Sequence, residues 1–141
     1  MKDNRWGLIF LAWSVALVST LGSLFFSEVM KYPPCILCWY QRICMYPLVL
    51  IFLSALFSTD TKVVRYSLPL TVVGLGIAIY HNLLYYNILP ESASPCIMGI
   101  SCTTVQLQWL GFITIPFLSL MGFGIIFILL MTLNRKDNRE K

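Results

Sequence analysis

Apolar residues dominate four long stretches of this chain, and no charged residue interrupts any of them. These charge-free stretches are Trp6–Phe26, Ile43–Ser58, Ser67–Pro90 and Ser92–Asn134. A helix needs about 20 mostly apolar residues to cross the roughly 30 Å hydrocarbon core of a bilayer. The pattern therefore predicts membrane-spanning helices at about 7–27, 38–57, 67–86 and 110–132.

The segment 87–109 is long enough to span a membrane, yet its composition favours a loop. It contains Pro90 and Pro95 together with many serine, threonine and glutamine residues. The first span could be mistaken for a secretory signal peptide, but its apolar part is longer than usual and no small-residue cleavage site follows. We therefore expect the span to be retained, and residues 1–141 to form a single all-α, four-helix transmembrane domain.

Composition excludes the soluble alternatives. Hydrophobic residues make up 58% of the 141 residues and charged residues only 11%, with a mean hydropathy of +0.78. A soluble domain has about 25% charged residues, and a disordered chain is far less apolar. The net charge of +4 is mild, so we expect no nucleic-acid partner.

Basic residues are distributed unequally between the two predicted sides of the membrane. One side carries eight of them, namely Lys2, Arg5, Lys62, Arg65, Arg135, Lys136, Arg139 and Lys141. The positive-inside rule then places both termini in the cytoplasm and the loops at about 28–37 and 87–109 outside. We expect the terminal charges to be solvated tails that set the topology and nothing more.

Four of the five cysteines fall in or next to the two predicted outer loops. Cys35 and Cys38 form C-I-L-C at the start of the second span, and Cys96 and Cys102 form C-I-M-G-I-S-C in the second loop. Disulfides form and persist on the non-cytoplasmic side of a membrane. Cys44 lies within the second span, where a free thiol packs as a small hydrophobe.

The two outer pairs fit a redox relay, a structural staple or a zinc site. A C-x-x-C closes too small a loop to be an effective staple, and the start of a helix after Pro33 and Pro34 stabilises a thiolate. Four cysteines could hold zinc, but no outer histidine supplements them and outer thiols tend to oxidise. We favour the redox interpretation and predict no metal.

A redox relay needs an electron acceptor. The chain has no G-x-G-x-x-G and no soluble domain in which a nucleotide or flavin could bind. An acceptor dissolved in the membrane fits best, and a quinone is such an acceptor.

Arg42 and His81 are the polar residues of the spans that fit a quinone site. Arg42 follows Cys38 by four residues, so both lie on one helical face. An arginine costs about 2.5–3.5 kcal/mol at the centre of a bilayer; near the outer end, Arg42 either snorkels or stabilises the Cys38 thiolate and polarises a quinone carbonyl. His81, at a similar depth, either hydrogen-bonds a neighbouring helix or serves the quinone.

Three motifs resemble the DsbB family of disulfide bond formation proteins. They are Pro34-Cys35-Ile36-Leu37-Cys38-Trp39-Tyr40-Gln41-Arg42, the histidine in Tyr80-His81-Asn82-Leu83-Leu84, and Gln108-Trp109-Leu110-Gly111 before Pro116. The similarity covers nearly the whole chain, and the C-x-L-C-x-x-x-R signature is its most specific part. The short spacing between Cys96 and Cys102 is similar to that of the BdbC-type members of Gram-positive bacteria.

The resemblance implies an enzyme of the bacterial cell membrane that reoxidises an extracytoplasmic thioredoxin-like thiol oxidase and passes the electrons to membrane quinone. Cys96 would form the mixed disulfide with the partner, and Cys102 would attack Cys35. Cys38 would then reduce the quinone beside Arg42. Two alternatives stay open: a disulfide-stapled membrane protein without redox turnover, and a small cation-coupled transporter. The transporter is disfavoured because no span contains a carboxylate.

Overall fold

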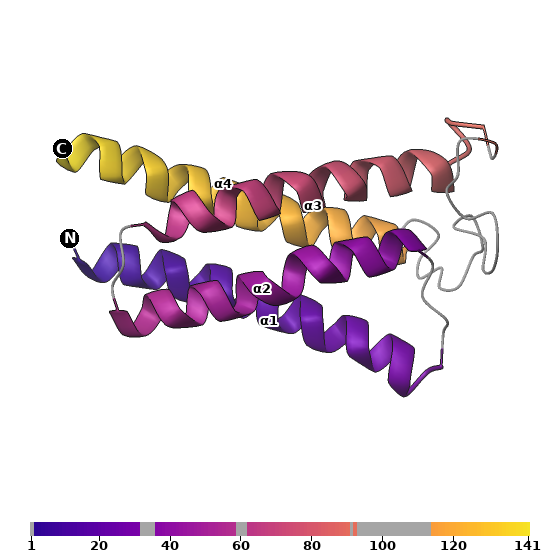
Figure 1. Ribbon diagram of the computed structural model, residues 1–141, viewed down its shortest axis with the longest axis horizontal. Helices are drawn as coiled ribbons and strands as arrows, with labels where there is room; N and C mark the ends of the chain where they lie inside the picture. The colour runs from indigo at the N-terminus through magenta and orange to yellow at the C-terminus, as the bar shows by residue number, and fades with distance from the viewer. Residues whose placement is uncertain (1, 32–35, 59–61, 91, 93–113) are drawn as a thin grey trace.

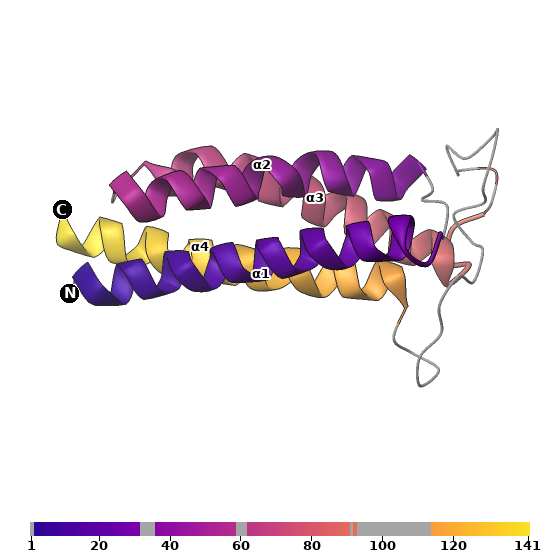
Figure 2. The same ribbon diagram turned by 90° about the horizontal axis from the view of Figure 1, so that it is seen from below.

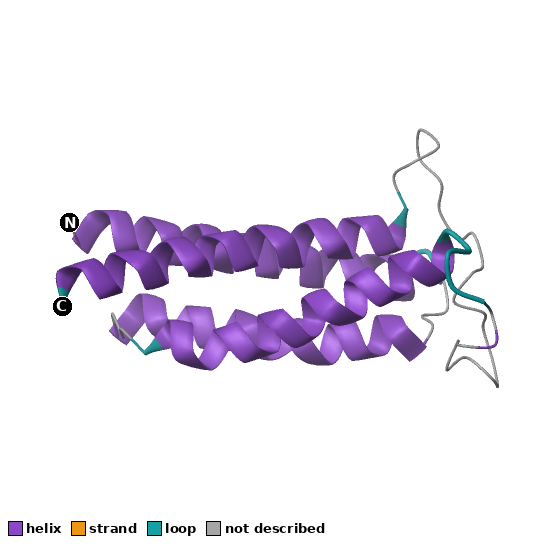
Figure 3. Ribbon diagram, turned by 90° about the horizontal axis from the view of Figure 1, so that it is seen from above, coloured by secondary structure: helices purple, strands orange, loops and turns teal. Residues whose placement is uncertain are grey.

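The chain forms four long helices in the computed structural model, which describes residues 2–31, 36–58, 62–90, 92 and 114–141. They are α1 (Lys2–Glu28), α2 (Ile36–Ser58), α3 (Val63–Tyr85) and α4 (Ile115–Glu140) (Figure 3). All four are long and apolar enough to cross a membrane, since 23 residues rise about 35 Å. The predicted all-α architecture with four spans is therefore confirmed.

The helices form a closed bundle in which each packs against two others. α1 contacts α2 and α4, and α3 contacts α2 and α4 (Figures 1 and 2). The first residues of α1 and the last of α4 lie at the same end of the bundle. We call the opposite end, where α1 and α3 end and α2 and α4 begin, the loop end. The assignment of the loop end to the outer side of the membrane stays a prediction from the charges.

Two helices extend beyond their predicted spans into charged sequence. α1 begins at Lys2 and α4 continues to Glu140, because hydropathy marks the apolar part of a helix and not its ends. Arg5 Nη1 lies 3.7 Å from a carboxylate oxygen of Asp137 and 3.5 Å from one of Glu140. The expectation that the terminal charges are only solvated tails is therefore wrong for Arg5, which joins α1 to α4.

Local capping fixes two helix ends at the loop end. α3 closes with Asn87 in the left-handed region (φ 56°), and the amides of Asn87 and Ile88 donate to the carbonyls of Leu84 and Leu83, which is a Schellman motif. α4 starts at Ile115, and the Phe117 amide donates to Thr114 Oγ1 at 3.3 Å. The predicted start of this span, 110–113, lies outside the described residues.

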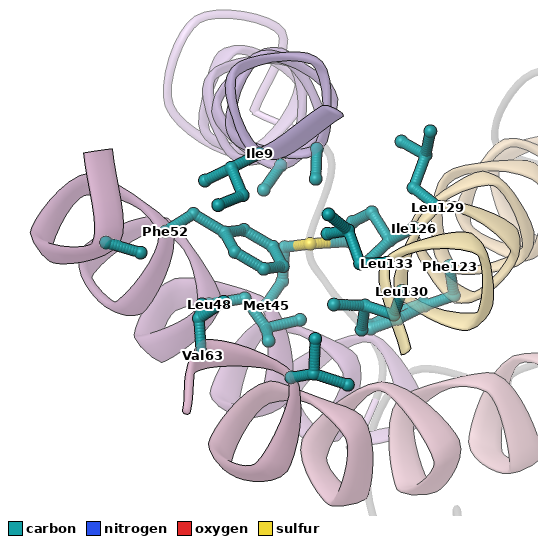
Figure 4. Close-up of a cluster of buried hydrophobic side chains, with 14 of the residues drawn as sticks. Ile9, Met45, Leu48, Phe52, Val63, Phe123, Ile126, Leu129, Leu130 and Leu133 are labelled. Atoms are coloured by element: carbon teal, nitrogen blue, oxygen red, sulfur yellow. The ribbon is translucent and has the colours of Figure 1, made fainter. Parts of the chain in front are cut away.

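The side-chain distribution suits a lipid environment. The core is apolar and draws on all four helices; its largest members include Leu48, Phe52, Phe123, Ile126 and Leu130, and Figure 4 shows them pointing toward one another. The outer surface is apolar as well: Phe57 is 85% exposed, Val18 68% and Leu50 65%. A bundle whose interior and exterior are both apolar has no surface suited to water along its spans.

Gly74 on α3 packs directly against the ring of Phe123 on α4. A Cβ on Gly74 would lie 2.3 Å from the nearest atom of the Phe123 ring, and Phe123 is almost fully buried. Small residues at helix contacts allow this closeness in membrane bundles. Any side chain at position 74 would therefore clash with the ring of Phe123.

Candidate functional site

A cavity of about 310 Å³ lies at the loop end between α1, α2 and α4. Its walls are largely apolar and include Val18, Phe26, Met45, Leu118 and Phe123. Polar groups enter from three helices: Ser19, Ser23 and Ser27 of α1, Cys38, Gln41 and Arg42 of α2, and Ser119 of α4. Ligand sites typically combine a mostly apolar wall with a few placed polar groups.

Cys38 and Arg42 both line this cavity. They are four residues apart in the first two turns of α2, so their side chains lie one above the other on the same face. Pro33 and Pro34, which precede the helix in the sequence, lie outside the described residues. The cavity therefore brings a sulfur atom and a guanidinium together on one wall.

Arg42 is held by α1. Its Nε donates to Ser23 Oγ at 2.8 Å, and its Nη2 donates to the Ser23 carbonyl at 2.9 Å and to Ser27 Oγ. The guanidinium carbon also lies 5.6 Å from the ring centroid of Trp39, within cation–π range. The positive charge is thus half-buried and held against a neighbouring helix.

The charge of Arg42 has no counter-ion within the described part of the chain. The ion pairs found there involve Arg5 and Lys141 at the other end of the bundle. Arginine has five N–H donors, and Nε and Nη2 supply all of the hydrogen bonds to α1. No hydrogen bond from Nη1 is found within the described part of the chain, and the charge favours an electron-rich ligand.

His81 lies behind the cavity and does not line it. The side chain is only 2% exposed, and its Nδ1 lies 3.4 Å from Gln41 Nε2. Gln41 lines the cavity, so it connects His81 on α3 to the site.

A second polar contact fixes α3 against the start of α4. Asn82 Nδ2 donates to the carbonyls of Ala78 at 2.8 Å and Pro116 at 2.9 Å. The Pro116 carbonyl also accepts from Ser119 Oγ at 2.8 Å, and Ser119 lines the cavity. Hydrogen bonds of this kind between helices hold neighbouring helices in register, while Asn82 Oδ1 has no hydrogen-bond partner within the described part of the chain.

The structure places two of the six site residues predicted from the sequence, Cys38 and Arg42, at the cavity. His81 approaches it through Gln41. Cys35, Cys96 and Cys102 lie outside the described residues. Cys44, predicted to be a packed thiol, is a free cysteine in the hydrophobic core and is 6% exposed.

Sequence reasoning missed the partners of both polar candidates. Ser23 and Ser27 are i and i+4 near the end of the first apolar stretch, and Gln41 is an amide inside the second. Polar groups in membrane spans usually face another helix, and this spacing on one face was a usable signal for the serines.

Comparison with known proteins gives one consistent family. The family model for disulfide bond formation protein DsbB matches residues 4–133. Disulfide bond formation protein C of Bacillus subtilis (strain 168) is 46% identical over 137 residues, which cover 97% of this chain and 99% of that protein. The probable disulfide formation protein of Metapseudomonas resinovorans is 45% identical over 132 residues, covering 93% and 92% of the two chains. No solved structure matches the chain significantly.

Proposed function

Because this chain belongs to the DsbB family of disulfide bond formation proteins, we propose that it reoxidises an extracytoplasmic thioredoxin-like thiol oxidase and passes the electrons through two cysteine pairs to membrane quinone. Family membership makes it a membrane oxidoreductase of disulfide formation; the partner, the quinone and the electron path are the proposal. The observation that carries it is the shared cavity of Cys38 and Arg42.

The cavity suits the head group of a quinone. Its volume of about 310 Å³ is at the lower end of the range for small-molecule sites, about 300–1,000 Å³. The apolar walls match a ring, and the Nη1 donors of Arg42 match a carbonyl oxygen. A quinone bound there supplies an acceptor for two electrons and two protons. Quinone and lipid share the bilayer, so a cavity between membrane helices is reached without crossing water.

Arg42 stabilises negative charge beside Cys38. A thiolate is the reactive form of cysteine in thiol exchange and in reduction, and a fixed cation nearby favours it. The same charge favours electron density on a carbonyl oxygen that accepts a hydrogen bond from Nη1. Lysine at this position would supply a point charge without the planar fork of donors.

The proposed cysteine relay is a series of exchanges that keep the total number of disulfides constant. The partner dithiol attacks the Cys96–Cys102 disulfide through Cys96, and leaves as a disulfide once its second thiol has displaced Cys96. Cys102, released as a thiolate, attacks Cys35 and frees Cys38. Cys96 then re-forms its bond with Cys102, releasing Cys35. Each exchange makes one S–S bond and breaks one.

The last step returns the first pair to its starting state. Cys35 and Cys38 join again as a disulfide and give up two electrons and two protons, which is what reduction of a quinone to a quinol consumes. The net reaction oxidises one partner dithiol for each quinone reduced. The relay follows the family resemblance for Cys35, Cys96 and Cys102, and the cavity supports the role of Cys38 and Arg42.

Steady-state oxidation of a reduced thioredoxin-like partner by the purified protein tests the proposal. With a short-chain quinone present, we expect turnover that rises with quinone concentration and saturates. Without quinone, oxidation should stop once the two resident disulfides are used. A protein whose disulfides are only structural staples would show no catalytic turnover under either condition.

A further inference from the structure

The guanidinium of Arg42 is bound along one edge by two serines of α1. Ser23 contributes both its hydroxyl and its carbonyl, and Ser27 contributes its hydroxyl. Ser27 Oγ itself donates to the Ser23 carbonyl at 3.2 Å. That carbonyl therefore accepts from both Ser27 and Arg42, and the three side chains form one closed network.

The network fixes the guanidinium of Arg42, a residue that lines the cavity. A long arginine near a membrane interface is free to extend its charged end into the headgroup region. Hydrogen bonds on Nε and Nη2 fix both the position and the plane of the guanidinium, because the group is rigid. The donors on Nη1 are then the ones that remain for a cavity ligand.

We propose that Ser23 and Ser27 are positioning residues for quinone: they hold Arg42 so that its Nη1 donors serve the cavity beside Cys38. The inference rests on the proposed function and deepens it, because it makes α1 part of the quinone site. Neither serine needs to touch the quinone in this role. Their effect on quinone binding passes through Arg42.

Ser27 does not need Arg42 for its own hydrogen bonding. A helical serine satisfies its hydroxyl on the carbonyl four residues earlier, as Ser14 does on Phe10 at 2.9 Å and Ser27 does on Ser23. Removal of the hydroxyls therefore leaves α1 intact and takes away two of the three hydrogen bonds that α1 makes with Arg42. Quinone binding is then expected to change more than helix stability.

Calorimetric titration of the oxidised protein with a short-chain quinone measures binding without turnover. The variants are Ser23→Ala, Ser27→Ala and the double variant, and Ser14→Ala is the matched control on the same helix. A lost hydrogen bond to a charged group corresponds to about tenfold or more in affinity. We expect the double variant to bind quinone about tenfold more weakly and Ser14→Ala to bind like the parent protein. Ser27→Thr, which keeps the hydroxyl, should retain most of the affinity.

Combination with Arg42→Ala separates positioning from packing. If the serines act through Arg42, the double serine variant should lose no further affinity once Arg42 is alanine, since coupled residues are not additive. The apparent KM for quinone should rise in the double serine variant while the KM for the thiol partner and the thermal midpoint stay unchanged.

Two results would overturn the inference. One is an unchanged quinone affinity in the double serine variant of a protein that turns over quinone normally. The other is a loss of the same size in the Arg42→Ala background, which would make the serines independent of the arginine. Absence of quinone binding and quinone-dependent turnover in the parent protein would instead refute the proposed function, and this inference with it.

Discussion

Gln41 Nε2 on α2 lies 3.4 Å from His81 Nδ1 on α3, and both side chains are almost completely buried. Gln41 lines the cavity, whereas His81 does not. Within the described part of the chain, the histidine is thus one side chain removed from the site. One route by which His81 can affect a cavity ligand therefore passes through the amide of Gln41.

Gln41→Met should weaken the quinone step. Methionine has nearly the same length as glutamine but cannot bond to His81 or to a carbonyl in the cavity. We expect kcat/KM for quinone to fall about threefold to tenfold, the size of one neutral hydrogen bond, with the partner's KM unchanged. Adding His81→Phe to Gln41→Met should cause little further loss in kcat/KM for quinone. A further large loss would show that His81 acts on the quinone by another route.

Gly74→Ala should destabilise the bundle. The new methyl would meet the buried ring of Phe123 at 2.3 Å, and overpacking of this kind typically costs about 1–3 kcal/mol. Phe123 lines the cavity, so displacement of its ring should also raise the KM for quinone. Thermal unfolding in detergent and steady-state kinetics measure the two effects.

Gly76→Ala is the matched control for Gly74→Ala. It lies two residues along the same helix, and a Cβ there meets nothing within 4 Å. We expect an unchanged or slightly higher thermal midpoint, because alanine favours the helix by about 1 kcal/mol over glycine. Equal destabilisation by both alanines would contradict the packing of Phe123 on Gly74.

Replacement of any relay cysteine by serine should abolish steady-state oxidation of the partner. Cys35, Cys38, Cys96 and Cys102 each supply a sulfur that an exchange step requires. Cys44→Ala is the control, since Cys44 lies in the hydrophobic core and has no part in the relay; it should keep its activity. Full activity of a Cys96→Ser, Cys102→Ser double variant would make the second pair structural.

Labelling of reduced cells with a membrane-impermeant thiol reagent tests the topology. The basic residues predict that Cys96 and Cys102 lie outside, where the reagent reaches them. Cys44, which is buried between helices, should react only after denaturation. Labelling of Cys96 and Cys102 from the cytoplasmic side alone would invert the arrangement and remove the oxidising compartment on which the relay depends.

The spans were predictable because apolar length alone decides whether a helix can cross a bilayer. Their ends were not, because a helix continues into water wherever its backbone bonds can form, as α4 does to Glu140. The ion pairs of Arg5 were not predicted either. They depend on two terminal segments lying together at one end of the bundle.

The relative positions of the site residues on α2 were predictable from the sequence. Their contacts with other helices were not. The spacing of Cys38 and Arg42 fixes their common face, which follows from helical geometry. The helix that Arg42 contacts was not predicted, because the apolar spans give little periodic signal for their neighbours apart from the pair of serines on α1. Ser23 and Ser27 became part of the site only when α1 was placed beside α2.

The most direct test of electron transfer to quinone is a count of quinol formed without oxygen. Purified protein is mixed anaerobically with an excess of short-chain quinone and a limiting amount of reduced thioredoxin-like partner, and quinol is measured by absorbance. We expect one quinol for each partner disulfide formed, and none from a Cys38→Ser variant. Continued oxidation of the partner without quinol formation, or quinol formation by the Cys38→Ser variant at the parent rate, would contradict electron transfer from Cys38 to quinone.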